Sequence, residues 1–108
     1  MNDEKLLIFA AKAAGMPPPV DAHGVWSAWV GSPEGGHWWD PLTDDGDALR
    51  LAVKLNIHIS LYGPDTGITA WIVKDSAHHF DADYGDDPCA SVRRAIVRAA
   101  AEIGREML

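Results

Sequence analysis

The sequence contains one cysteine, no long apolar run, and no lysine or arginine between Lys12 and Arg50. Because Cys89 is the only cysteine, the chain cannot form an internal disulfide, which fits a reducing compartment. No stretch approaches the roughly 20 apolar residues that a membrane-spanning helix requires. The N-terminus also lacks the basic region and apolar run of a secretory signal. We therefore expect a soluble, cytoplasmic protein that does not enter a membrane.

The charge balance is acidic. Nine Lys and Arg residues stand against 16 Asp and Glu, so the net charge is −7. Proteins that bind nucleic acid through its phosphates depend on basic residues, so this composition argues against direct nucleic-acid binding. With 108 residues and a hydrophobic fraction of 47%, the chain is predicted to fold as one domain, residues 1–108, around one core.

Three helices are predicted, over residues 3–14, 44–55 and 88–106. Asn2 and Thr43 are the expected N-caps of the first two, since their side chains can accept a bond from a free backbone N–H. Asp86 or Asp87 is expected to cap the third helix, with Pro88 at its first position. Gly15, followed by three prolines, is typical of a helix end, and so is Asn56.

Four strands are predicted, over residues 25–30, 37–39, 57–62 and 68–73, because these segments alternate or are rich in aromatic and β-branched residues. Residues 17–24 are interpreted as a linker and residues 74–87 as a polar connection. The predicted fold is of the α/β class (α+β type). It is a three-layer αβα sandwich in which helices cover both faces of a mainly antiparallel sheet of about four strands.

The acidic segment Asp44-Asp45-Gly46-Asp47 could be a cation-binding loop or the charged start of a helix. If Gly46 were the sixth position of an EF-hand loop, the first would be Pro41 and the twelfth Ala52. Neither residue can supply a side-chain ligand. We therefore interpret these acids as first-turn residues that the helix dipole favours.

A second cluster, His78, His79, Asp81 and Asp83, could supply metal ligands. It lacks the HExxH or paired CxxC spacing that would make a zinc site a strong prediction. His58 and Ser60 share a strand face without an orienting acid, and Cys89 at a helix start has no assigned base. We expect a protein without catalytic residues, metal or cofactor, and keep a small metal-dependent hydrolase using the His78/His79 segment as the alternative.

Five tryptophans are many for this length. Trp38 and Trp39 must point to opposite sides if they lie in a strand. At least one tryptophan is therefore expected either near the surface, as a contact for a partner or a second copy of the chain, or under a helix on the second face of the sheet. The run of acids before the last helix is either an ordinary solvated surface or an acidic face for a basic partner. The candidate interaction residues are Trp38, Trp39, Asp81, Asp83, Asp86 and Asp87.

Two segments carry a family resemblance. WWDPLTDDGDALRLAVKL, residues 38–55, and DPCASVRRAIVRAAAEIG, residues 87–104, resemble a family of small bacteriophage and prophage proteins with an αβα-sandwich domain. The family pattern of Trp, Asn or Asp, Pro-Leu and DDGDALRLAVKL is met almost throughout, and the Trp38-Trp39 doublet departs from its single Trp. The resemblance implies fold and origin but no chemistry.

From these observations we expect a non-enzymatic phage or prophage accessory protein that acts by contact with a host or phage protein. One variant is an inhibitor of a host defence or nucleic-acid-handling complex that binds through the acidic face.

Overall fold

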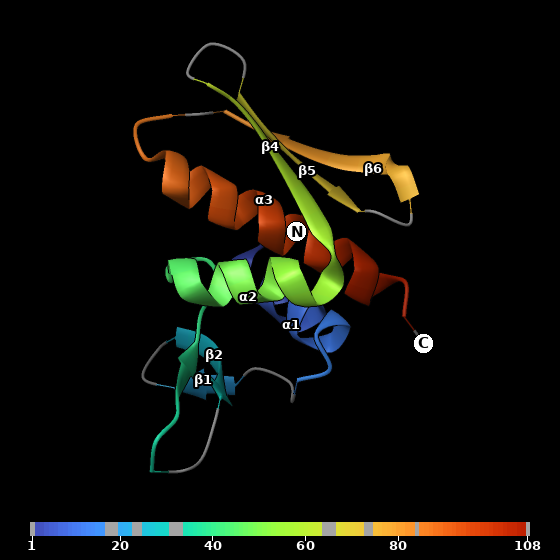
Figure 1. The fold of residues 1–108 in the computed structure, drawn as a ribbon. Coiled ribbons are helices and arrows are strands. Elements are labelled where there is room, and N and C mark those ends of the chain that lie inside the picture. The colour runs from blue at the N-terminus through green and yellow to red at the C-terminus, as the bar shows by residue number, and fades with distance from the viewer. Residues whose placement is uncertain are drawn as a thin grey trace.

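The computed structural model describes residues 2–16, 20–22, 25–30, 34–63, 67–72, 75–83 and 85–107 (Figure 1). Within that part the fold is mixed α+β, with three helices and two small antiparallel sheets. The elements are α1 (Asp3–Ala13), β1 (Val20–Ala22), β2 (Val25–Val30), β3 (His37–Trp39), α2 (Asp45–Leu55), β4 (Ile57–Gly63), β5 (Gly67–Ile72), β6 (Asp75–Ala82) and α3 (Pro88–Arg105).

The larger sheet has the order β4-β5-β6, and neighbouring strands run antiparallel. Ile59 pairs with Ala70, and Ala70 pairs with Phe80, so these three side chains share one face. The buried residues Ile57 and Ile68 belong to the same face. This face forms the apolar side of the sheet.

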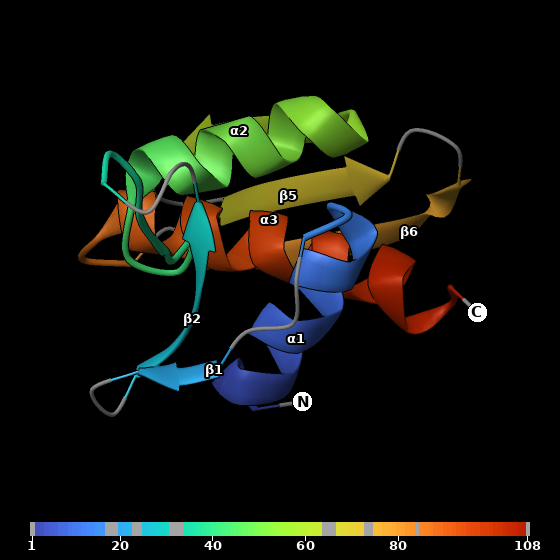
Figure 2. The ribbon, with the colours of Figure 1, turned by 90° about the horizontal axis from the view of Figure 1, so that it is seen from below.

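Helix α3 packs against all three strands of this sheet, and α2 contacts its edge strand β4. Helix α1 packs against α3 and lies on the side of α3 away from the sheet (Figures 1 and 2). The predicted three-layer sandwich and four-stranded sheet are therefore not confirmed. The described residues show three helices, a three-stranded antiparallel sheet, and a second small sheet in the order β1-β2-β3.

Two strands lie where the sequence predicts loops. Strand β1 falls within the predicted linker 17–24, and β6 falls within the predicted connection 74–87. The polar sequence of β6 gives no clear alternation, but β5 offers it a full edge of hydrogen-bonding groups. Thr69 Oγ1 also donates to Asp81 Oδ1 at 2.7 Å across the two strands. Tertiary pairing here outweighs local propensity.

The helix termini largely follow the sequence signals. Asn2 caps α1 by accepting a hydrogen bond from Lys5 N at 2.9 Å, and Asp87 caps α3 with Pro88 directly after it. Asn56 ends α2 in the left-handed conformation, with φ of 55°. The Thr43 prediction is wrong by one residue: Asp44 is the N-cap of α2, and its carboxylate accepts from Asp47 N at 2.8 Å.

The interface between α1 and α3 is built from small residues. The alanines at positions 10, 11, 99 and 100 are completely buried. Gly104 approaches the backbone of α1 so closely that a Cβ added to it would lie 1.8 Å from the carbonyl oxygen of Phe9. The absence of side-chain bulk allows the two helices to meet backbone to backbone, and this contact is the most extensive between any two described elements.

Candidate functional site

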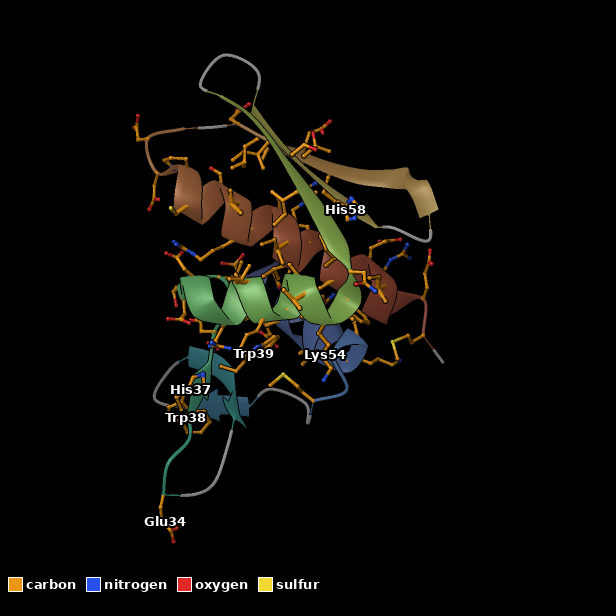
Figure 3. The ribbon with its side chains drawn as sticks, viewed as in Figure 1. Glu34, His37, Trp38, Trp39, Lys54 and His58 are labelled. Carbon is orange, nitrogen blue, oxygen red and sulfur yellow. The ribbon has the colours of Figure 1, made fainter. Side chains whose placement is uncertain are left out.

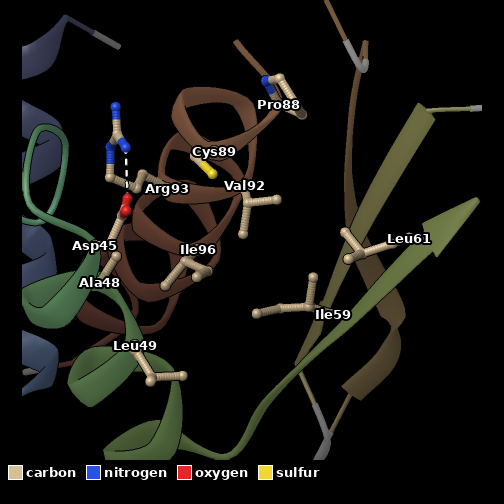
Figure 4. Close-up of a pocket in the computed structure, with 10 residues that line it drawn as sticks. All are labelled: Asp45, Ala48, Leu49, Ile59, Leu61, Pro88, Cys89, Val92, Arg93 and Ile96. Carbon is tan, nitrogen blue, oxygen red and sulfur yellow. Dashed lines mark hydrogen bonds and ion pairs between the residues drawn. The ribbon is translucent and has the colours of Figure 1, made fainter. Parts of the chain in front are cut away.

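An apolar groove of about 300 Å³ opens between α2, α3 and β4 (Figure 4). Its walls come from three separate parts of the chain. The lining residues are Asp45, Ala48, Leu49, Ile59, Leu61, Pro88, Cys89, Val92, Arg93 and Ile96. We call this feature the α2–α3–β4 groove.

Regular periodicity places apolar side chains on each wall. Cys89, Val92 and Ile96 follow one another at helical spacing along α3, and Ile59 and Leu61 share a face of β4. The close-up shows the two β4 side chains pointing toward α3 across the open space. Figure 1 shows β4 rising away from α3 toward the C-terminal end of the strand, and the groove lies between these elements.

Large apolar side chains are left in solvent around this opening. Leu49 and Leu61 line it and are 61% and 64% exposed, and Val53, one turn after Leu49 on α2, is 70% exposed. Single exposed apolar residues are ordinary on a protein surface. Three of them beside an unfilled apolar groove are characteristic of a surface that binds another molecule.

Arg93 closes one end of the groove and fastens α3 to the start of α2. Its Nη1 donates to Asp45 Oδ1 at 2.6 Å, and its Nε donates to the carbonyl oxygen of Leu42 at 2.9 Å. Asp45 therefore neutralises the one basic side chain of the lining. Asp86 and Asp87, just before the lining residue Pro88, are exposed, so the rim of the groove beside Pro88 is acidic.

A second polar cluster surrounds Asp47, whose side chain is only 1% exposed. Its carboxylate accepts from Asp40 N at 2.9 Å and from Arg50 Nη2 at 2.8 Å, and it lies 2.9 Å from His37 Nε2. Burial by itself raises the pKa of Asp47. The hydrogen bonds from Asp40, His37 and Arg50 outweigh burial and hold the pKa below its ordinary value of 3.8.

The Asp47 cluster ties β3 to α2, because Asp47 belongs to α2 and its partner His37, labelled in Figure 3, belongs to β3. A histidine oriented by a buried carboxylate is a familiar component of general-base sites. Within the described part of the chain, His37 hydrogen-bonds to Asp47 and to no hydroxyl or thiol, and no group of three or more metal-ligating residues occurs there. We interpret the cluster as a structural tether.

The tryptophan pair behaves as two separate residues. Trp38 is 43% exposed and Trp39 is 5% exposed, so they face opposite sides of β3 as predicted. Trp39 belongs to the core, and Trp38 is the member of the pair that a partner can reach. Trp29 pairs with Trp38 in the small sheet, while the side chains of Trp26, Trp29 and Trp71 lie outside the described residues.

The predicted acidic cluster is dispersed. Asp81 accepts from Thr69 within the sheet, and Asp87 accepts from Ala90 N at 3.1 Å as the α3 cap. Asp83 and Asp86 are exposed in the segment that joins β6 to α3. The side chains of His78 and His79 lie outside the described residues, so the metal hypothesis stays a prediction.

The sequence analysis did not single out Leu49, Leu61 or Arg93. A signal for α2 does exist: its apolar positions include Ala48, Leu49, Leu51, Ala52 and Val53, a stripe wider than one buried face requires. Comparison of the chain with protein-family models, curated proteins and solved structures found no match. Among the helices of the described part, none is long and apolar enough to cross a membrane.

Proposed function

We propose that this protein is a non-enzymatic binding protein and that its α2–α3–β4 groove holds apolar side chains of another protein. One observation carries the proposal: an open apolar groove of about 300 Å³ flanked by Leu49, Val53 and Leu61 in solvent. Burying apolar surface is worth about 25 cal/mol per Å², so covering these side chains favours association.

The polar groups of the groove support binding more than catalysis. Arg93 and Asp45 are engaged with each other, and Cys89 is an exposed free thiol. Covalent catalysis uses a nucleophile hydrogen-bonded to a base, and no such bond is seen between the described lining residues of the groove.

The acidic rim of the groove indicates the charge of the partner. Asp86 and Asp87, the two residues before the lining residue Pro88, are exposed, so a partner with basic residues beside its apolar anchors fits best. An inhibitor of a nucleic-acid-handling complex is one class of protein that meets basic surfaces in this way. The phage or prophage origin, the αβα-sandwich family and a location in the bacterial cytoplasm rest on the sequence patterns alone.

Cys89 makes the proposal testable, since the only thiol of the chain lines the groove and is exposed. A benzophenone maleimide attached to Cys89 would be photoactivated in a bacterial lysate, and captured proteins would be identified by mass spectrometry. The control carries the same label at residue 5, on α1, in a Cys89→Ser, Lys5→Cys chain.

The expected result is one protein captured from position 89 and not from position 5, with capture lost in Leu49→Lys. The candidate is then purified and its binding to the unlabelled chain is measured by calorimetry. Absence of a specific product at position 89, or capture that Leu49→Lys leaves unchanged, would contradict the proposed function.

A further inference from the structure

The larger sheet ends at β4. Among the described residues β4 pairs with β5 alone, so the outer edge of β4 carries unpaired backbone N–H and C=O groups. We infer that the partner binds as an extended segment that pairs with this edge and lays alternate side chains into the α2–α3–β4 groove. This inference rests on the proposed function and names the form that the partner takes.

The two edges of the sheet differ in composition. Strand β6 carries Asp75 and Asp81, and charged residues on an edge strand discourage further pairing. The β4 sequence IHISLYG contains no Asp, Glu, Lys, Arg or Pro. Strand β4 is thus the edge without these protective features, and it is the edge beside the groove.

The groove lies on the face of β4 that an added strand would share. Ile59 and Leu61 point into the groove, and successive residues of any added strand alternate between that face and the opposite one. Helix α2 contacts β4 and leaves Leu49 and Val53 exposed. Every second side chain of an added strand would therefore reach apolar surface that the chain itself leaves uncovered.

Charge selects the segment. The chain carries −7 overall, and Asp86 and Asp87, directly before the lining residue Pro88, are exposed. Asp83 adds to the same sign in the segment before α3. A segment with lysine or arginine flanking its apolar residues is attracted, whereas a second copy of this chain brings another seven negative charges. The occupant is therefore a basic, alternating, extended segment of another protein.

The test uses a synthetic peptide that matches the seven residues of β4 in length. Its sequence is Lys-Val-Thr-Ile-Thr-Val-Lys with a fluorescent label, and binding to the full chain is followed by anisotropy. One control peptide has glutamate at both ends. The other carries N-methyl groups on alternate residues, which keeps the side chains but blocks strand pairing. Hydrogen exchange measures protection of the β4 amides.

The expected result is saturable binding of the lysine peptide, slower exchange of amides 57–63, and affinity about tenfold or more weaker for both control peptides. Leu61→Thr removes an apolar wall and is expected to weaken binding. The matched variant His58→Thr changes an exposed residue on the opposite face of β4 and is expected to leave binding unchanged.

No binding up to about 1 mM peptide, or equal binding of the N-methylated peptide, would overturn strand addition. Self-association of the chain with β4 protection, detected by native mass spectrometry, would overturn it in favour of a second copy. A protein captured through Cys89 that leaves the β4 amides unprotected would overturn the strand geometry and still support the groove as a contact surface.

Discussion

Replacing Gly104 with alanine tests the close approach of α1 and α3. The added Cβ would lie 1.8 Å from the Phe9 carbonyl oxygen, whereas carbon and oxygen approach to about 3.3 Å at the closest ordinary contact. The two backbones would have to separate by about 1.5 Å. The obstacle is main chain, so no side-chain rotation relieves it.

Two effects of this substitution have opposite signs. Alanine favours a helix over glycine by about 0.8–1.0 kcal/mol. Overpacking a close interface costs about 1–3 kcal/mol and occasionally more, and here the displaced interface is the largest in the described structure. We expect the clash to outweigh the helix propensity, with a net loss of about 1–2 kcal/mol in the free energy of unfolding and a melting temperature lower by about 5–10 °C.

Gly46→Ala is the matched control for this prediction. Its added Cβ would lie 3.1 Å from the Arg50 guanidinium and 3.3 Å from Asp44 Oδ2. Both are side-chain ends, so shifts of a few tenths of an ångström relieve these contacts without moving main chain or breaking the bond of Arg50 to Asp47. Urea unfolding followed by circular dichroism should show Gly46→Ala within about 0.5 kcal/mol of the parent chain or slightly more stable. If Gly104→Ala proves as stable as Gly46→Ala, the close packing of α1 against α3 is wrong.

Four further predictions concern the tether, a helix cap and the metal hypothesis. Asp47→Asn should lower the free energy of unfolding by about 1–3 kcal/mol. This loss is smaller than for a fully buried ion pair, because the His37 and Arg50 side chains are 50% and 64% exposed. An unchanged midpoint of urea unfolding would refute the tether. Since the folded-state pKa of Asp47 is lowered, its contribution is complete above 3.8 and is lost as pH falls through that folded pKa. The stability difference between the parent and Asp47→Asn should therefore shrink below 3.8, and a difference that grows there would contradict the sign. Asn56→Ala should lower the free energy of unfolding by about 1 kcal/mol, because residue 56 has a left-handed backbone with φ of 55°. Calorimetry should show Asn56→Gly as stable as the parent chain or more stable. Adding Zn²⁺ or EDTA should leave the melting temperature unchanged. A clear shift of the melting temperature with Zn²⁺ would support a metal site at His78 and His79 instead.

Local signals were sufficient to predict the helices. The capping residues Asn2 and Asp87 and the left-handed Asn56 are sequence features that act within one turn, so the predicted bounds differ from the observed ones by a residue at each disputed end. The coarse α+β class is confirmed for the same reason. Strand β6 was missed because it forms by pairing with β5, and residues 75–82 show no hydrophobic alternation that would predict a strand from their own sequence.

The groove could not be predicted in the same way. Its walls come from residues 45–49, 59–61 and 88–96, and hydrophobic periodicity shows which side chains avoid water but not that two packed surfaces diverge. The role of Asp47 was also hidden. As a first-turn acid it fits the helix dipole, and only the fold shows that His37, ten residues earlier, reaches the same carboxylate.

The position of α3 has a consequence for biosynthesis. Helices α1 and α2 and the three strands of the larger sheet all pack against this helix, which follows them in the chain. A nascent polypeptide that has not yet reached Pro88 lacks the main surface against which α1 packs, and the apolar face of its larger sheet is left in contact with water. The hydrophobic core therefore assembles late, once residues 88–105 have left the ribosome. Until then the leucines and isoleucines of the larger sheet and of the first two helices stay exposed, and chaperones bind exposed apolar segments of this kind.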